Sequence, residues 1–119
     1  MSISTLTTQR KVPKGLQKKI DAILKHIVEI LNPEIVFLIG SMHHGTIHDN
    51  SDLDLVAVIN GYYPRKNILL DVLPSRPHKD IPLDLHIYDR NQFEEMKTIG
   101  GLCFEAYNHG RKIYTGGAT

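Results

Sequence analysis

The sequence predicts an α/β (α+β) fold in which helices flank a small mixed sheet. Residues 14–31 carry apolar side chains at three- and four-residue spacing, which is typical of one face of a helix. Three later segments, 34–40, 53–59 and 82–88, are rich in β-branched residues or alternate between polar and apolar, which indicates strands. Helical and strand-like segments therefore alternate along the chain.

The first helix has clear boundaries in the sequence. Residues 1–12 are polar with scattered apolar side chains, and we expect them to form a flexible N-terminal arm. Pro13 precedes the helix, and Asn32-Pro33 ends it, because proline cannot continue a helix. We expect residues 13–119 to form one domain, since a chain of 119 residues supplies a single core.

The segments between and after the strands are less regular. Residues 60–80 are rich in turn residues at both ends, and we expect a loop with a short helix near 67–73. Residues 91–110 predict one or two short helices interrupted at Gly100-Gly101, and 111–117 predict a short extended segment.

Composition excludes several classes of protein. The net charge is +1, from 14 basic and 13 acidic residues, which gives no general attraction to duplex nucleic acid. No apolar run approaches the length of a membrane span, and the N-terminus lacks the apolar core of a secretory signal. Cys103 is the single cysteine, so no internal disulfide can form. We therefore expect a cytoplasmic protein that binds no membrane. We also expect no nucleic acid template, because a single domain of this size leaves no room for a second domain to hold one.

Carboxylates occur at the start of two of the predicted strands. Asp52 and Asp54 point to the same side of their strand, about 7 Å apart, because strand side chains alternate. Asp84 lies on the polar side of the next strand and could join them if the two strands are neighbours. Like charges so close disfavour each other's ionisation unless a cation lies between them, and Mg²⁺ prefers such oxygen ligands. The pattern predicts a site for one or two metal ions.

The stretch before these carboxylates suits a phosphate group. Gly40-Ser41 follows directly on a buried strand, so the backbone can approach a ligand closely and the Ser41 hydroxyl can donate to it. His44 and His48, four residues apart, raise the alternative of a zinc site, but no cysteine pair completes it. We interpret these histidines as loop residues without a metal.

Together these residues carry a resemblance to a known family. Gly40-Ser41, ten further residues and Asp52-x-Asp54 match the G-S-x(10)-D-x-D signature of the DNA polymerase beta-like nucleotidyltransferase superfamily. The longer run "GSMHHGTIHDNSDLDL" resembles the minimal nucleotidyltransferase (MNT) family, and "PLDLHIY" resembles the strand that bears its third carboxylate, at Asp84. The likeness extends over roughly residues 15–114.

The resemblance implies an enzyme that moves a nucleoside monophosphate from a nucleoside triphosphate, ATP first among them, to a hydroxyl, releasing pyrophosphate. It implies that Asp52, Asp54 and Asp84 are catalytic and bind Mg²⁺, with Mn²⁺ as a substitute. Phosphate binding is implied at positions that match the family's loop: Gly40, Ser41, His44 and Ser51. It also implies a HEPN-domain partner protein, as in a toxin–antitoxin system, with the transferase in the antitoxin-like role.

The sequence departs from the family at one place and leaves alternatives open. Met42, His43 and His44 stand where many members carry arginine, and an unperturbed histidine is mostly neutral at pH 7. A non-catalytic binding or antitoxin subunit that keeps the fold is therefore one alternative. A small-molecule nucleotidyltransferase of the antibiotic-modifying kind is another, and the sequence leaves a homo-oligomer open.

Overall fold

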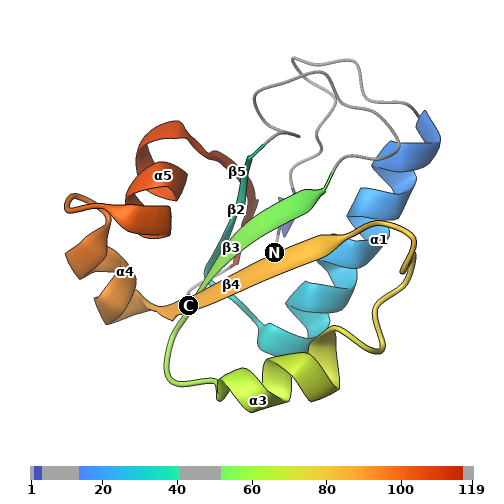
Figure 1. The fold of residues 1–119 in the computed structure, drawn as a ribbon, viewed down its shortest axis with the longest axis horizontal. Coiled ribbons are helices and arrows are strands. Elements are labelled where there is room, and N and C mark those ends of the chain that lie inside the picture. The colour runs from blue at the N-terminus through green and yellow to red at the C-terminus, as the bar shows by residue number, and fades with distance from the viewer. Residues whose placement is uncertain (1, 4–13, 41–51, 117–119) are drawn as a thin grey trace.

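The computed structural model describes residues 2–3, 14–40 and 52–116, which form a five-stranded sheet with helices on both faces (Figure 1). The strand order is β1-β5-β2-β3-β4. All neighbours pair antiparallel except β3 and β4, which run parallel. The strands are β1 (Ser2–Ile3), β2 (Ile35–Ile39), β3 (Leu53–Ile59), β4 (Leu83–Asp89) and β5 (Arg111–Thr115). This mixed sheet with flanking helices confirms the predicted fold class.

Helix α1 (Lys14–Leu31) covers one face of the sheet, which we call the first face. Its apolar side chains recur at helical spacing, so they line one side of the helix and are buried against the strands. The helix ends as the sequence predicts, since Asn32 adopts a positive φ of 47° and Pro33 follows. The buried residues of α1 are Leu16, Ile20, Ile23, Leu24, Ile27, Val28 and Leu31.

The central strand β3 sends alternate side chains to opposite faces. Leu53, Leu55 and Ala57 enter the large core beneath α1. Val56 and Val58 enter a smaller core on the opposite, second face, which helices α4 and α5 cover. Asp54 belongs to the same row as these two valines, because it is two residues before Val56. The sequence therefore places a carboxylate on the second face, at the beginning of β3.

The parallel pairing of β3 and β4 requires a crossover, and residues 60–82 supply it. The crossover contains a short turn of helix, α3 (Arg65–Asn67), followed by a π-helix, η1 (Ile68–Val72). The His26 side chain on α1 donates from Nε2 to the Val72 carbonyl at 2.9 Å, which fixes the end of η1 on the first face. The sequence predicted a helix here, but not its π geometry.

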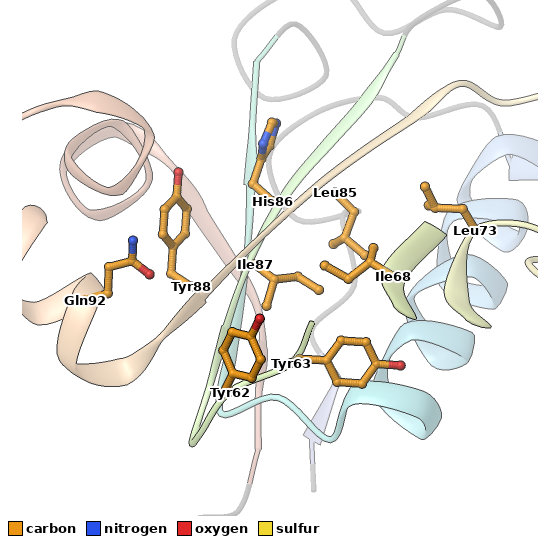
Figure 2. Close-up of a pocket in the computed structure, with 9 residues that line it drawn as sticks. All are labelled: Tyr62, Tyr63, Ile68, Leu73, Leu85, His86, Ile87, Tyr88 and Gln92. Atoms are coloured by element: carbon orange, nitrogen blue, oxygen red, sulfur yellow. The ribbon is translucent and has the colours of Figure 1, made fainter. Parts of the chain in front are cut away.

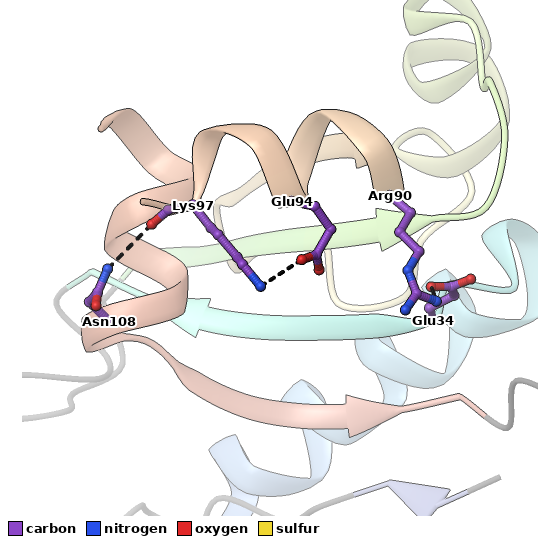
Figure 3. Close-up of polar contacts among 5 residues, drawn as sticks. All are labelled: Glu34, Arg90, Glu94, Lys97 and Asn108. Atoms are coloured by element: carbon purple, nitrogen blue, oxygen red, sulfur yellow. Dashed lines mark hydrogen bonds and ion pairs between the residues drawn. The ribbon is translucent and has the colours of Figure 1, made fainter. Parts of the chain in front are cut away.

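Two short helices cover the second face: α4 (Arg90–Met96) and α5 (Gly101–His109). Phe93 of α4 stacks on Phe37 of β2 with ring centroids 5.5 Å apart. Polar contacts at the surface add to this packing (Figure 3): Arg90 pairs with Glu34 at 2.9 Å, and Lys97 pairs with Glu94 at 2.6 Å. The Asn108 amide also donates to the Lys97 carbonyl, which links α5 to the end of α4 (Figure 3).

The N-terminal region adds a strand that the sequence did not predict. Ser2 and Ile3 pair antiparallel with Thr115 and Tyr114 of β5. Residues 4–13 lie outside the described residues, so the flexible arm proposed for residues 1–12 stays a prediction, as does the single domain at 13–119. Within the described part of the chain, no helix has the length and apolar character needed to cross a membrane.

Candidate active site

The register between β3 and β4 brings two of the predicted carboxylates side by side. Asp54 and Asp84 are direct partners in the parallel ladder, so both side chains leave the sheet on the second face. Asp54 is half-buried, whereas Asp84 is exposed. His86, two residues beyond Asp84, lies on that face as well. The beginnings of two neighbouring strands therefore present an open cluster of titratable side chains.

The electrostatics of Asp54 reflect this crowding. Its pKa is raised above the ordinary value of 3.8, first by burial, then by a hydrogen bond with Asp84 and by the negative charges of Asp84 and Asp52. The nearby His86 side chain opposes the shift. Two carboxylates this close repel each other, so ionisation of both is unfavourable without a cation. This donor set is suited to a divalent cation.

Gly40 has a steric role at the same place. It follows Ile39, which pairs with Asp54 across β2 and β3. Its φ is +80°, and a Cβ atom there would collide with Oδ2 of Asp54 and lie 3.2 Å from its Cγ. The side-chain carboxylate of Asp54 thus lies directly against the Gly40 backbone. Glycine is required here both by its backbone conformation and by the close approach of the carboxylate.

The other predicted site residues are placed differently. Asp52 immediately precedes β3, is exposed, and acts on Asp54 through its charge. Ser41, His44 and Ser51 lie outside the described residues, so their predicted contacts with phosphate stay predictions. Among the described residues, no three His, Cys, Asp or Glu side chains stand close enough together to enclose a metal ion. Mg²⁺ commonly takes only one or two carboxylates and completes its ligands with water and substrate phosphates, which fits the Asp54–Asp84 pair.

A pocket of about 340 Å³ lies along β4, where its lining begins at Leu85, the residue after Asp84 (Figure 2). His86 and Tyr88 of β4 and Gln92 of α4 line its polar side, and Tyr62 and Tyr63 come from the loop after β3. Sequence analysis assigned no role to these residues. The sequence did contain one indication for His86 and Tyr88, because the alternation of residues 82–88 places them on the same side of the strand as Asp84. No sequence pattern indicated that Tyr62 and Tyr63 line the pocket, because their position depends on the path of the crossover.

Comparisons with known proteins establish the fold. No protein-family model matches the chain, and no curated protein matches it. Among solved structures, the chain is similar to one from the toxin-antitoxin pair MntA-HpeT, crystallised as a mutant in which two aspartates two positions apart are glutamate. The TM-score is 0.58 with 18% sequence identity, over 80% of this chain and 72% of that chain. The likeness shows that the chain shares the mixed α/β fold of that structure.

Proposed function

We propose that this protein is a Mg²⁺-dependent nucleotidyltransferase that transfers a nucleoside monophosphate, with ATP as the preferred donor, to a hydroxyl group on a partner protein. The contact between Asp54 and Asp84 carries the proposal, because a strand-borne carboxylate pair with a raised Asp54 pKa is an arrangement that a cation completes. The Asp52-x-Asp54 spacing also equals that of the two aspartates mutated in the MntA-HpeT structure.

The proposed reaction assigns a role to each of the three carboxylates. The acceptor oxygen forms a bond to the α-phosphorus, the bond from that phosphorus to the bridging oxygen breaks, and pyrophosphate leaves with the electron pair. Asp84, the most exposed end of the pair, orients the acceptor hydroxyl and takes its proton. Asp52 and Asp54 hold the donor in line with it. These carboxylates would hold Mg²⁺ or Mn²⁺, which when bound would supply positive charge to neutralise the phosphates.

The partner is proposed to be a HEPN-domain protein in a toxin–antitoxin pair. The structural likeness to a chain of the MntA-HpeT pair supports this setting, together with the sequence motif. In this role the transfer of a nucleotide to the partner would silence it. Localisation in the cytoplasm is part of the same proposal.

A second candidate is a binding subunit that neutralises its partner without catalysis. The observation that favours it is the absence, among the described residues, of a ready-made site with three metal ligands. The effect of Asp54→Asn on neutralisation of the partner distinguishes the two candidates. A catalytic antitoxin loses neutralisation when Asp54 is replaced by Asn, whereas a binding subunit retains it.

The test mixes the purified protein, Mg²⁺ and the protein encoded beside it with ATP labelled on either the α- or the γ-phosphate. We expect label from the α-phosphate in the partner and label from the γ-phosphate only in pyrophosphate. Asp54→Asn and Asp84→Asn should abolish transfer. Asp80→Asn is the matched control, because Asp80 is an exposed carboxylate paired with Lys19 away from the site. Equal labelling by all three variants would contradict the proposal.

A further inference from the structure

Strand β4 forms one edge of the sheet and pairs with β3 on one side only. The register of that pairing determines which backbone N–H and C=O groups of β4 face away from β3. The Leu53 N–H donates to the Pro82 carbonyl at 2.9 Å, and the parallel register continues from there through Asp89. In such a ladder the backbone groups of Asp84, His86 and Tyr88 face β3. Those of Leu83, Leu85 and Ile87 consequently face outward.

These outward groups are unpaired within the part of the chain that the structure describes, where no backbone or side-chain bond reaches the N–H or C=O of Leu85 or Ile87. Apart from its two aspartates, β4 also lacks the usual protections of an edge strand. Residues 83–89 contain no proline, lysine or arginine, and the pairing with β3 runs without a bulge over all seven residues. A free edge of this length is a template for one more strand.

The pocket of about 340 Å³ wraps around this edge, so that an added strand would find a different surface on each face of the sheet. Figure 2 shows the Leu85 and Ile87 side chains on the same side of β4 as Ile68 and Leu73, which makes that side apolar. The opposite side presents His86, Tyr88 and Gln92. Tyr62, which is 85% exposed, stands beside the edge. We call this feature the β4 groove.

We propose that the β4 groove binds an extended segment of the partner protein, which adds a strand to the sheet and presents the acceptor hydroxyl to Asp84. This inference rests on the proposed function. Cross-strand neighbours on one face have Cβ atoms about 4.5–5.5 Å apart. A residue opposite Asp84 therefore projects its side chain to the second face, next to the carboxylate pair. The groove thus specifies both how the segment binds and which of its residues is modified.

The groove also specifies the character of that segment. Its residues alternate: apolar side chains lie beside Leu85 and Ile87, and polar side chains, the hydroxyl residue among them, lie beside Asp84 and His86. Among the described residues, no lysine or arginine lines the pocket, whereas the hydroxyl of its lining residue Tyr63 donates to Asp71 at 3.3 Å, and Asp84 precedes its lining residues Leu85 and His86 on β4. This charge favours a lysine or arginine in the segment.

The experiment uses an array of nonapeptides with Ser, Thr or Tyr at the centre, alternating apolar and polar flanks, and one added lysine. Binding to the wild-type protein is measured by fluorescence anisotropy, and the tightest peptide is then N-methylated at each position in turn. We expect methylation at every second residue to weaken binding by about tenfold, which is the effect of one lost backbone hydrogen bond, and the other positions to tolerate it. A uniform response, or no bound peptide, would overturn the proposal.

A pair of variants tests the same edge from the side of the protein. Ile87→Pro removes an outward N–H without touching the bonds to β3, and Ile87→Ala removes the same side chain but keeps that N–H. We expect Ile87→Pro to bind the peptide about tenfold more weakly than Ile87→Ala. Equal binding by the two would contradict the proposal. If Ile87→Pro fails to fold by circular dichroism, the methylation pattern decides alone, since it uses the wild-type protein.

Two controls separate this inference from its rivals. A wild-type dimer in sedimentation equilibrium that Ile87→Pro abolishes would show that the occupant of the groove is a second copy, and the proposal would be wrong. Peptide binding with the two-residue pattern but without nucleotide transfer would mean that the groove is correct and the proposed activity is not. Nucleotide transfer without the two-residue pattern would mean that the proposed activity is correct and the proposed groove is not.

Discussion

The two faces of the sheet are built from the same strands but are completed differently. On the first face, Leu53, Leu55 and Ala57 of β3 are fully buried beneath an 18-residue helix. On the second face, Val56 and Val58 are just as well covered, by two short helices. Asp54, which continues the valine row, is only half-buried, and its neighbour Asp84 is exposed. The two carboxylates thus lie where the cover of the sheet is incomplete.

The contrast between the two faces concerns how each contributes to the free energy of folding. The first face holds most of the buried apolar side chains, and burial of apolar area is the main source of folding free energy. The second face has a smaller core and accepts a carboxylate pair whose repulsion is unfavourable in the absence of a cation. We therefore expect substitutions on the first face to change the free energy of unfolding and substitutions at the carboxylates to change ligand binding.

The largest effect on stability is expected at the centre of the first face. Ile23 of α1 is completely buried, so Ile23→Ala leaves a cavity and should lower the free energy of unfolding by about 2–5 kcal/mol. Urea denaturation followed by circular dichroism measures it. Lys25→Ala, on the exposed side of the same helix, is the control and should stay within about 0.5 kcal/mol of wild type. A small effect of Ile23→Ala would break the contrast between the faces.

A smaller loss is expected at Gly40, where the second face and the site meet. Gly40→Ala forces a positive φ on alanine and drives its Cβ into the Asp54 carboxylate, which should cost about 1–3 kcal/mol. In an Asp54→Ala background the collision is gone, so the cost of Gly40→Ala should fall to the backbone strain alone. The double-mutant cycle in urea measures this difference. Additive effects would mean that the two residues do not touch.

The pH dependence of stability should have opposite signs at two carboxylates. The folded-state pKa of Asp54 is raised above 3.8, so the metal-free protein should lose stability as pH rises from 3.8 through that pKa. Asp54→Asn should remove this loss and be at least as stable as wild type at pH 7. Asp80, whose pKa is lowered by its hydrogen bond with Lys19, should contribute stability above 3.8 that disappears at lower pH. Melting temperatures in EDTA across pH 3–8 test both signs.

The smallest effect is expected for the surface contacts of the second face. Arg90 pairs with Glu34 at 2.9 Å, but 57% of the Arg90 side chain is exposed to solvent. Such pairs contribute at most about 1 kcal/mol and weaken with salt. Arg90→Ala should therefore change the urea midpoint slightly, and less so in 1 M NaCl. A loss as large as that of Ile23→Ala would mean that α4 depends on this ion pair.

Local patterns in the sequence were sufficient for most of the fold. The spacing from Leu16 to Leu31 predicted α1 and its buried side, and Asn32-Pro33 predicted its end. Alternation in residues 82–88 predicted which side chains of β4 share a face with Asp84. These features depend on neighbours a few residues away, which a sequence displays directly.

Other features depend on contacts between distant segments. The parallel register that makes Asp54 and Asp84 direct partners joins two strands separated by the crossover that contains η1. β1 exists through its pairing with β5, at the opposite end of the chain. The pocket along β4 collects Tyr62 and Gln92 from either side of that strand in the sequence. The register, β1 and the pocket all depend on tertiary packing, and no periodic pattern in the sequence predicts them.

The central claim is that Asp54 and Asp84 hold a divalent cation together with a nucleotide. Isothermal titration calorimetry with a non-hydrolysable ATP analogue tests it directly, because binding is measured without an acceptor. We expect the wild-type protein to bind the analogue in Mg²⁺ and to lose at least about tenfold in affinity, or ~1.4 kcal/mol, when EDTA replaces Mg²⁺. Asp54→Asn should show the same weak binding with Mg²⁺ present, while Asp80→Asn binds like wild type. Affinity that is unchanged in Asp54→Asn, or indifferent to Mg²⁺ in the wild type, would contradict the account.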